Sequence, residues 1–167
     1  MNTTTLSPKH GRLLPPKEPG GPVSYAVDHL VTFGETSMAG FVYYIRLVEW
    51  QGRLRETFAF DLVPEYMHML ADGRLVMLTQ SVSCEYFSEI KLGELISQRL
   101  AISWIDGARM LGDYAYYRTT PDSEELVAQG QQMWVNATPR GTAAPWPASV
   151  LDVCRRLDVD TSQALTT

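Results

Sequence analysis

The chain has 167 residues, of which 45% are hydrophobic, and a formal net charge of −5. This composition suits one compact domain, and its acidic balance argues against a nucleic-acid surface. No apolar run approaches the roughly 18 residues of a membrane span. Cys84 and Cys154 form no disulfide framework and, with three scattered histidines, no metal-ligand spacing. We expect a cytoplasmic protein with reduced cysteines that binds no metal, nucleic acid or membrane.

Composition divides the chain into three parts. Residues 1–22 are rich in Thr, Pro, Gly and Lys without periodicity, which predicts a disordered lead. Residues 23–136 carry the regular patterns of a folded domain. Residues 137–167 form a C-terminal tail in which 148–157 can make a short amphipathic helix. This tail is either disordered or a segment that caps a neighbouring subunit.

The first half of the domain predicts one strand and two helices. Residues 24–32 are rich in β-formers and lack a helical stripe, which favours a strand. Helical spacing, with Leu54 and Phe58 on the apolar face, predicts a long helix over residues 40–60. Pro64 disfavours helical geometry at Val63 and can begin a second, short helix through Leu70.

The second half of the domain changes to strands. Residues 75–87, 95–105, 109–118 and 125–135 are β-rich runs separated by turn signals, and Asp106-Gly107 is a strong hairpin signal. One strand, one long helix and four further strands predict an α+β domain. Its antiparallel five-stranded sheet, with the last four strands in a meander, would wrap around the helix.

A polar loop precedes the long helix and holds groups that suit oxyanion chemistry. Thr36 or Ser37 can cap the helix, while the free N–H groups of its first turn point outward. Gly40 lets a ligand approach the backbone closely, although a glycine can equally punctuate a loop-to-helix junction. From the residues alone, this loop is either a helix cap or an anion-binding site.

Charged residues follow on the helix. Arg55 and Glu49 can serve a site, or they can pair with neighbouring charges on a solvated face. The residues themselves do not separate the two interpretations.

The segment from Glu35 to Glu56 resembles the signature of hotdog-fold acyl thioesterases of the 4-hydroxybenzoyl-CoA type, especially those of enediyne polyketide biosynthesis. The resemblance is carried by Glu35-Thr-Ser-Met-Ala-Gly-Phe-Val-Tyr-Tyr and by Trp50-Gln-Gly-Arg-Leu-Arg-Glu56, and it continues through Cys84-Glu-Tyr-Phe-Ser-Glu-Ile90. It implies a hotdog domain over residues 23–136, a homodimer or homotetramer with active sites at subunit interfaces, and thioester hydrolysis without a metal or other cofactor.

The resemblance also implies roles for particular residues. Ser37 stands where one branch of the family has a carboxylate and the enediyne branch has an asparagine that works with the arginine matching Arg55. Phe41 stands where His or Asn commonly follows the glycine. We expect Tyr44 N–H and Arg55 to stabilise the thioester oxyanion, with Glu35 as a base. The expected substrate-binding residues are Thr36, Met38, Gly40, Phe41, Tyr43, Glu49 and Trp50.

The resemblance further implies that the substrate is carried on phosphopantetheine by an acyl carrier protein of an iterative polyketide synthase. A polyene or β-ketoacyl chain is the expected acyl group. Three alternatives remain open: an enzyme that releases or edits an aromatic or shorter acyl group, a non-catalytic acyl-binding hotdog protein, and a structural dimerisation domain.

Overall fold

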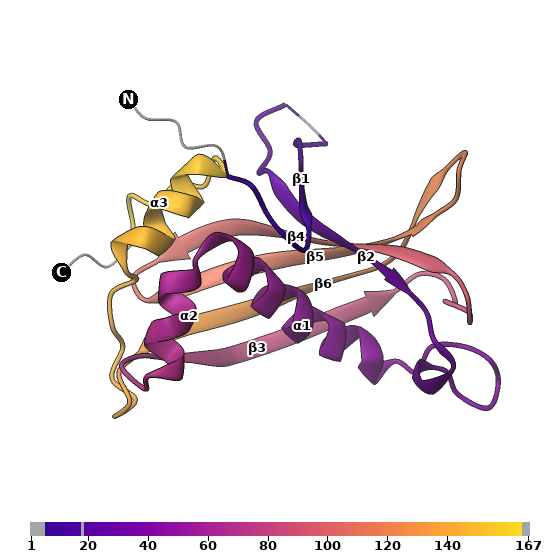
Figure 1. Cartoon of the computed structure of the whole chain (residues 1–167), viewed down its shortest axis with the longest axis horizontal. Helices are drawn as coiled ribbons and strands as arrows, with labels where there is room; N and C mark the ends of the chain where they lie inside the picture. The colour runs from indigo at the N-terminus through magenta and orange to yellow at the C-terminus, as the bar shows by residue number, and fades with distance from the viewer. Residues whose placement is uncertain (1–5, 18, 165–167) are drawn as a thin grey trace.

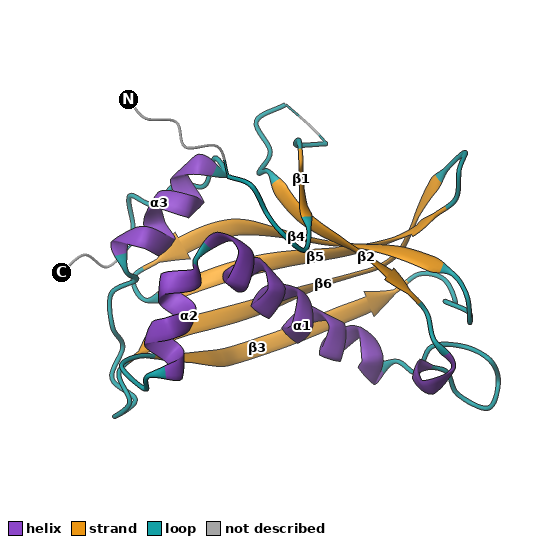
Figure 2. Ribbon diagram, in the orientation of Figure 1, coloured by secondary structure: helices purple, strands orange, loops and turns teal. Residues whose placement is uncertain are grey.

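A computed structural model describes residues 6–17 and 19–164. Its elements in chain order are β1 (Arg12–Leu14), β2 (Ser24–Leu30), the 3-10 turn η1 (Phe33–Glu35), α1 (Ile45–Leu62), α2 (Pro64–Ala71), β3 (Val76–Tyr86), β4 (Leu95–Asp106), β5 (Arg109–Thr119), β6 (Glu124–Ala137) and α3 (Ala148–Arg156). The long helix α1 lies across one face of a sheet that curves around it (Figures 1 and 2), which confirms the predicted α+β architecture.

The sheet of the described residues has six strands rather than five. Its order is β1-β2-β4-β5-β6-β3, and every neighbouring pair is antiparallel. The sixth strand is β1, in which Arg12 pairs with Ala26. The expected disordered lead is therefore wrong for this segment, because edge pairing with β2 satisfies a backbone that has little apolar surface. Residues 1–5 and 18 lie outside the described residues.

The predicted meander holds only for β4, β5 and β6. β3 lies at the opposite edge beside β6, so the chain crosses the end of the sheet between β3 and β4. The alternation of residues along a segment identifies a strand but not the strand that it pairs with, which explains why the predicted pairing of β3 with β4 is wrong. The Asp106-Gly107 hairpin is confirmed, with Asp106 opposite Arg109 and Gly107 at φ +61°.

The core fills the space between α1 and the sheet. Leu47, Trp50, Leu54 and Phe58, spaced three or four residues apart, are all buried on one face of α1. Pro64 opens α2 at its first turn, as predicted.

The C-terminal segment packs on its own chain. Val150, Leu151, Val153 and Cys154 of α3 join the hydrophobic core, as does Trp146 just before it. Gly107 N–H donates to Gln163 O at 2.8 Å, so the segment also contacts the β4–β5 hairpin. It closes one end of the helix layer, while residues 165–167 lie outside the described part of the chain.

Candidate functional site

The loop before α1 is a closed turn rather than a helix start. Ser37 N–H donates to Phe41 O at 2.7 Å, and Gly40 N–H donates to Ser37 O at 2.9 Å. Gly40 has φ +82°, a left-handed conformation that no α-helix contains, so α1 begins only at Ile45. The predicted helix start at Gly40 and the predicted capping by Thr36 or Ser37 are both wrong. Instead, Thr36 Oγ1 donates to Phe33 O, and Ser37 Oγ accepts from Ala39 N–H.

Glu35 anchors this loop to the core. Its carboxylate accepts hydrogen bonds from Thr32 N–H and Oγ1, each at 2.8 Å, from Trp50 Nε1 at 2.9 Å and from His29 Nε2. Burial raises the pKa of Glu35, but the hydrogen bonds from Thr32, Trp50 and His29 outweigh it and lower the pKa to about 2. So weak a base with so many donors is suited to holding the loop. The role of Glu35 as a catalytic base stays a prediction, and these hydrogen bonds disfavour it because they weaken the base.

Tyr44 is the residue immediately before α1, and its N–H is unpaired. Neither Tyr44 N–H nor Ile45 N–H donates to an acceptor among the described residues, because both lie before the first intrahelical bond. The aligned peptide dipoles of α1 place partial positive charge at the same point. These two donors form the kind of anion site that the resemblance implied for Tyr44.

A cavity of about 330 Å³ lies beside Tyr44. Aromatic and aliphatic side chains dominate its lining, which consists of Phe41, Val42, Tyr44, Leu47, Tyr86, Phe87, Ser88, Glu89 and Ile90. Val42 N–H donates to Ile90 O at 2.8 Å and joins the loop before α1 to the loop after β3. Arg118 on β5 donates to Ser88 Oγ and to Glu89 O and so holds the far wall.

Arg55 lies elsewhere in the protomer. Its Nη1 donates to Thr79 Oγ1 on β3 at 3.0 Å, and its side chain, 16% exposed, points at the sheet near Trp134. Because an α-helix rises about 1.5 Å per residue, Arg55 is about 15 Å along the axis from Ile45. The segment that contains Ser37 extends beyond the opposite end of α1 (Figure 1). A single protomer therefore does not bring Ser37 and Arg55 together.

The other predicted site residues divide into buried and exposed groups. Trp50 is 1% exposed and packs against His29 and Tyr116, which leaves no surface for a ligand. Met38 is fully exposed at the tip of the loop, and the ring of Tyr43 lies tilted against that of Tyr44, with 4.7 Å between the ring centroids. Glu49 is exposed and pairs with Arg46 at 2.7 Å. Of the predicted substrate-binding residues, only Phe41 lines the cavity beside Tyr44.

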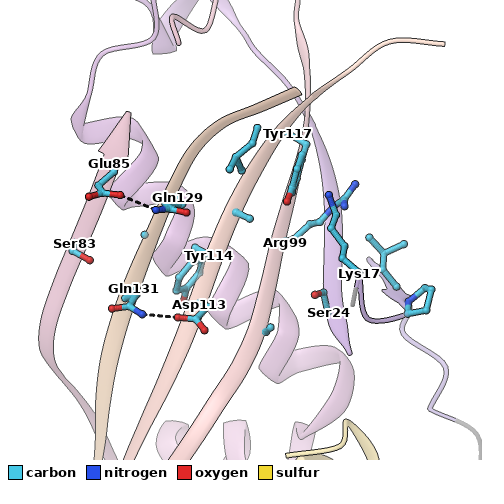
Figure 3. A pocket seen from close by; sticks show the side chains of 16 residues that line it. Lys17, Ser24, Ser83, Glu85, Arg99, Asp113, Tyr114, Tyr117, Gln129 and Gln131 are labelled. Atoms are coloured by element: carbon cyan, nitrogen blue, oxygen red, sulfur yellow. Dashed lines mark hydrogen bonds between the residues drawn. The ribbon is translucent and has the colours of Figure 1, made fainter. Parts of the chain in front are cut away.

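A larger cavity of about 590 Å³ lies on the opposite face of the sheet (Figure 3). None of the predicted site residues lines it. Its polar groups bind one another: Gln129 donates to Glu85 and Gln131 donates to Asp113, each within 2.8 Å, and Arg99 pairs with Glu124. Because these groups are already satisfied, this cavity offers fewer free donors than the start of α1, and we assign the site to the smaller cavity.

The sequence interpretation missed His29 and Arg118. Tyr25, Val27 and His29 alternate along β2 and lie on its inner side, a period of two that was available in the sequence. Nothing local marked Arg118, whose partners Ser88 and Glu94 are far away in the chain. The helices of residues 6–17 and 19–164 include none with the length and apolarity needed to cross a membrane.

The chain matches no protein-family profile and no curated protein sequence. Among solved structures, it is similar to the dynemicin thioesterase, whose crystal structures reveal polyene binding. The two are 31% identical over 82% of this chain and 98% of that one, with a TM-score of 0.75. A 1,4-dihydroxy-2-naphthoyl-CoA thioesterase from Synechocystis is 21% identical over 81% and 98%, with a TM-score of 0.71.

The 4-hydroxybenzoyl-CoA thioesterase from Pseudomonas sp. strain CBS-3 is 18% identical over 78% of this chain and 99% of that one, with a TM-score of 0.69. The identity to the dynemicin enzyme over nearly its whole length goes beyond a shared fold. Together with the resemblance of the segment around Ser37 and α1, it assigns the activity class. The chain is a hydrolase of acyl thioesters and belongs to the hotdog-fold acyl thioesterases.

Proposed function

We propose that this thioesterase releases a polyketide chain from the acyl carrier protein of an iterative synthase in an enediyne-type pathway. The observation that carries the proposal is the pair of unpaired N–H groups at Tyr44 and Ile45, beside an aromatic-lined cavity of about 330 Å³. Flat aromatic surfaces suit a conjugated acyl chain such as a polyene. The polyene bound by the dynemicin thioesterase supports the same substrate class.

In the proposed reaction, the thioester carbonyl accepts a hydrogen bond from Tyr44 N–H. Water adds to the carbonyl carbon, the oxygen takes up negative charge, and the carbon–sulfur bond then breaks to release the acid and the thiol. The N–H donors and the dipole of α1 stabilise the charged oxygen. The Ser37 hydroxyl would hold the attacking water, a role that is supported by the bond from Ser37 N–H to the backbone of Phe41, a cavity residue.

Arg55 joins such a site only if a second subunit supplies it. β3 is an edge strand with a largely exposed pattern that includes Leu78 and Val82, so its free backbone groups can pair with another copy. The loop between β2 and α1, in which Phe33 and Met38 are exposed, would then pack on the partner subunit. We propose a homodimer, alone or paired into a tetramer, in which Ser37 of one subunit meets Arg55 of the other.

The proposed substrate arrives on phosphopantetheine, and the protein itself needs no cofactor. The Lys91 ammonium lies 5.7 Å from the ring of Phe41, a cavity residue, which supports a contact with the phosphate of the arm. Arg53 is exposed on α1 and can contact the carrier protein. Such a reaction takes place where the synthase works, in the cytoplasm.

Hydrolysis of matched substrates tests the proposal. The same polyene acyl group is loaded on the carrier domain of an iterative synthase and on coenzyme A, and released acid is measured with wild type and Ser37→Ala. We expect faster release from the carrier and slower release by the variant. Equal rates on the two carriers would contradict the carrier partner, and release no faster than without enzyme would contradict the substrate.

A mixed dimer tests the shared site. Subunits carrying Ser37→Ala and Arg55→Ala are co-expressed with different tags and purified as heterodimers. Because a two-fold dimer then has one doubly altered site and one intact site, we expect about half of the wild-type activity. If both residues act within one subunit, both sites are damaged and the heterodimer is no more active than either altered homodimer.

The volume of the cavity favours a second candidate substrate. A cavity of about 150 Å³ holds one benzene ring, and 330 Å³ is near the lower end of ligand pockets. An aromatic or shorter acyl group in a related synthase pathway therefore also fits. Rates over a series of acyl-CoA thioesters, from benzoyl and hexanoyl to long polyenoyl, decide between them: a maximum at the short members would support this candidate.

A further inference from the structure

Tyr86, the last residue of β3, is bound to the start of α1. Its hydroxyl donates to Tyr44 O at 2.8 Å, and the same carbonyl accepts Leu47 N–H at 3.3 Å. Because a peptide unit is planar, fixing the carbonyl of Tyr44 also fixes the direction of Ile45 N–H. The phenol hydroxyl, with the shorter of the two bonds, therefore helps to set the orientation of the peptide that begins the helix.

The same tyrosine lines the cavity beside Tyr44. The remaining wall is held by other contacts, which include the bond from Val42 to Ile90 and the contacts of Arg118 with Ser88 and Glu89. Partial burial raises the pKa of Tyr86, so the phenol keeps its proton and stays a donor through the ordinary assay range. Loss of the hydroxyl would leave the Tyr44 carbonyl with its longer bond from Leu47 N–H, which loosens the first turn of α1, while the cavity stays lined by the same ring.

We propose that Tyr86 is a positioning residue of the thioester site. Its hydroxyl helps to hold the peptide between Tyr44 and Ile45 so that the unpaired Ile45 N–H, beside that of Tyr44, faces the oxygen on which charge develops. Donors that are already oriented stabilise that charge without reorganisation during the reaction. This inference rests on the proposed site at Tyr44 and Ile45 and adds the residue that keeps the second of its two donors, Ile45 N–H, in place.

Tyr116 offers a matched control on the same helix. Its hydroxyl donates to Leu47 O at 2.9 Å, one turn further into α1, and the residue is fully buried. Tyr116 does not line the cavity. Tyr116→Phe and Tyr86→Phe therefore each remove one phenol hydroxyl bound to a carbonyl of α1, but only Tyr86→Phe frees the peptide at the site.

The experiment uses the full chain as wild type, Tyr86→Phe and Tyr116→Phe, with benzoyl-CoA, octanoyl-CoA and a polyenoyl carrier protein as substrates. Released thiol gives kcat and KM, thermal unfolding gives stability, and hydrogen exchange follows peptides that contain Leu47 N–H. For Tyr86→Phe, we expect kcat to fall about threefold to tenfold with KM within about twofold, as for one lost hydrogen bond to an aligned donor. Exchange should become faster only in the first turn of α1.

Tyr116→Phe is expected to lower the unfolding temperature while kcat stays within about twofold, because the buried hydrogen bond that is lost goes to Leu47 O, in a peptide that carries neither Tyr44 N–H nor Ile45 N–H. An unchanged kcat in Tyr86→Phe would overturn the inference. So would a fall in kcat that is proportional to the loss of unfolding temperature in both variants. If wild type hydrolyses none of the substrates, the proposed function fails and the positioning role of Tyr86 in the reaction fails with it. Faster exchange in Tyr86→Phe would then show that the hydroxyl only holds the helix start.

Discussion

A hydrogen-bonded carboxylate anchors each end of α1, but the two ends differ in how much of the surrounding chain covers them. Before the helix, Glu35 accepts hydrogen bonds from Thr32, Trp50 and His29, and on the last turn Asp61 accepts them from Tyr25, His10 and Gly11. Both carboxylates are largely buried, with 12% of the Glu35 side chain and none of the Asp61 side chain exposed. Each has a pKa lowered to about 2.

The difference lies in what surrounds each anchor. Around Asp61, the N-terminal segment bonds to the helix through His10 N–H and Gly11 N–H and packs so closely on β2 that a Cβ at Gly11 would lie 2.4 Å from the ring of Tyr25. Around Glu35, the aromatic rings of Tyr43 and Tyr44 are half-exposed, and the first N–H groups of α1 are unpaired. A firmly anchored but uncovered helix start is what an oxyanion site requires, so we expect changes at Asp61 to affect stability and changes near Ser37 to affect rate.

The largest expected effect is that of Asp61→Ala. It removes the acceptor of Tyr25 Oη, which lies 2.6 Å away, and of two backbone N–H groups, and it leaves buried donors unpaired. We expect the free energy of unfolding to fall by about 3 kcal/mol. Urea unfolding measures it, with the exposed Asp152→Ala on α3 as the control, and a loss no larger than that of the control would contradict the anchor.

Acid should weaken both anchors together. The ordinary pKa values are 3.8 for Asp61 and 4.5 for Glu35, and both are about 2 in the folded chain. As the pH falls from about 5 to 2, the unfolded chain takes up protons that the folded chain does not, so stability is lost. Thermal unfolding across this range should show the loss, with a shallower slope in Asp61→Asn and Glu35→Gln. Identical slopes in wild type and variants would refute the assignment.

Ser37→Ala should affect rate without affecting stability. The Ser37 side chain is half-buried in a surface turn, where its hydroxyl accepts only a long bond of 3.3 Å from Ala39 N–H. We expect kcat to fall about tenfold if the hydroxyl holds the attacking water, with unfolding unchanged within about 0.5 kcal/mol. Thioester hydrolysis and urea unfolding of one preparation test both halves, and an unchanged kcat would remove Ser37 from the mechanism.

The smallest effect is expected for the charged surface near the site. Arg46 and Glu49 pair at 2.7 Å, but both side chains are more than a third exposed. We expect Arg46→Ala to cost less than about 0.5 kcal/mol because water screens such a pair. A larger loss in urea unfolding would show that the guanidinium bond to Gly34 O also holds the loop.

Local signals in the sequence were sufficient for most elements. Pro64 opens α2 and Gly107 makes the β4–β5 hairpin because each has a backbone preference that acts over a few residues. The start of α1 was misplaced because apolar spacing at Phe41 and Tyr44 continued the helical period beyond a glycine held at φ +82°. The likeness of the Glu35–Glu56 segment to known thioesterases identified the fold and the reaction.

The sequence by itself thus determined the α+β class, the thioesterase family and the segment that holds Ser37 and Tyr44. Only the tertiary structure decided that β3 pairs with β6, that Glu35 is an anchor and that Arg55 bonds to Thr79 on β3 instead of reaching the loop of Ser37. Periodicity and turn preferences act between near neighbours in the chain, whereas these contacts join residues between 15 positions apart, for Glu35 and Trp50, and 61 positions apart, for Val76 and Ala137. Such contacts depend on how whole elements pack, and no local pattern encodes that packing.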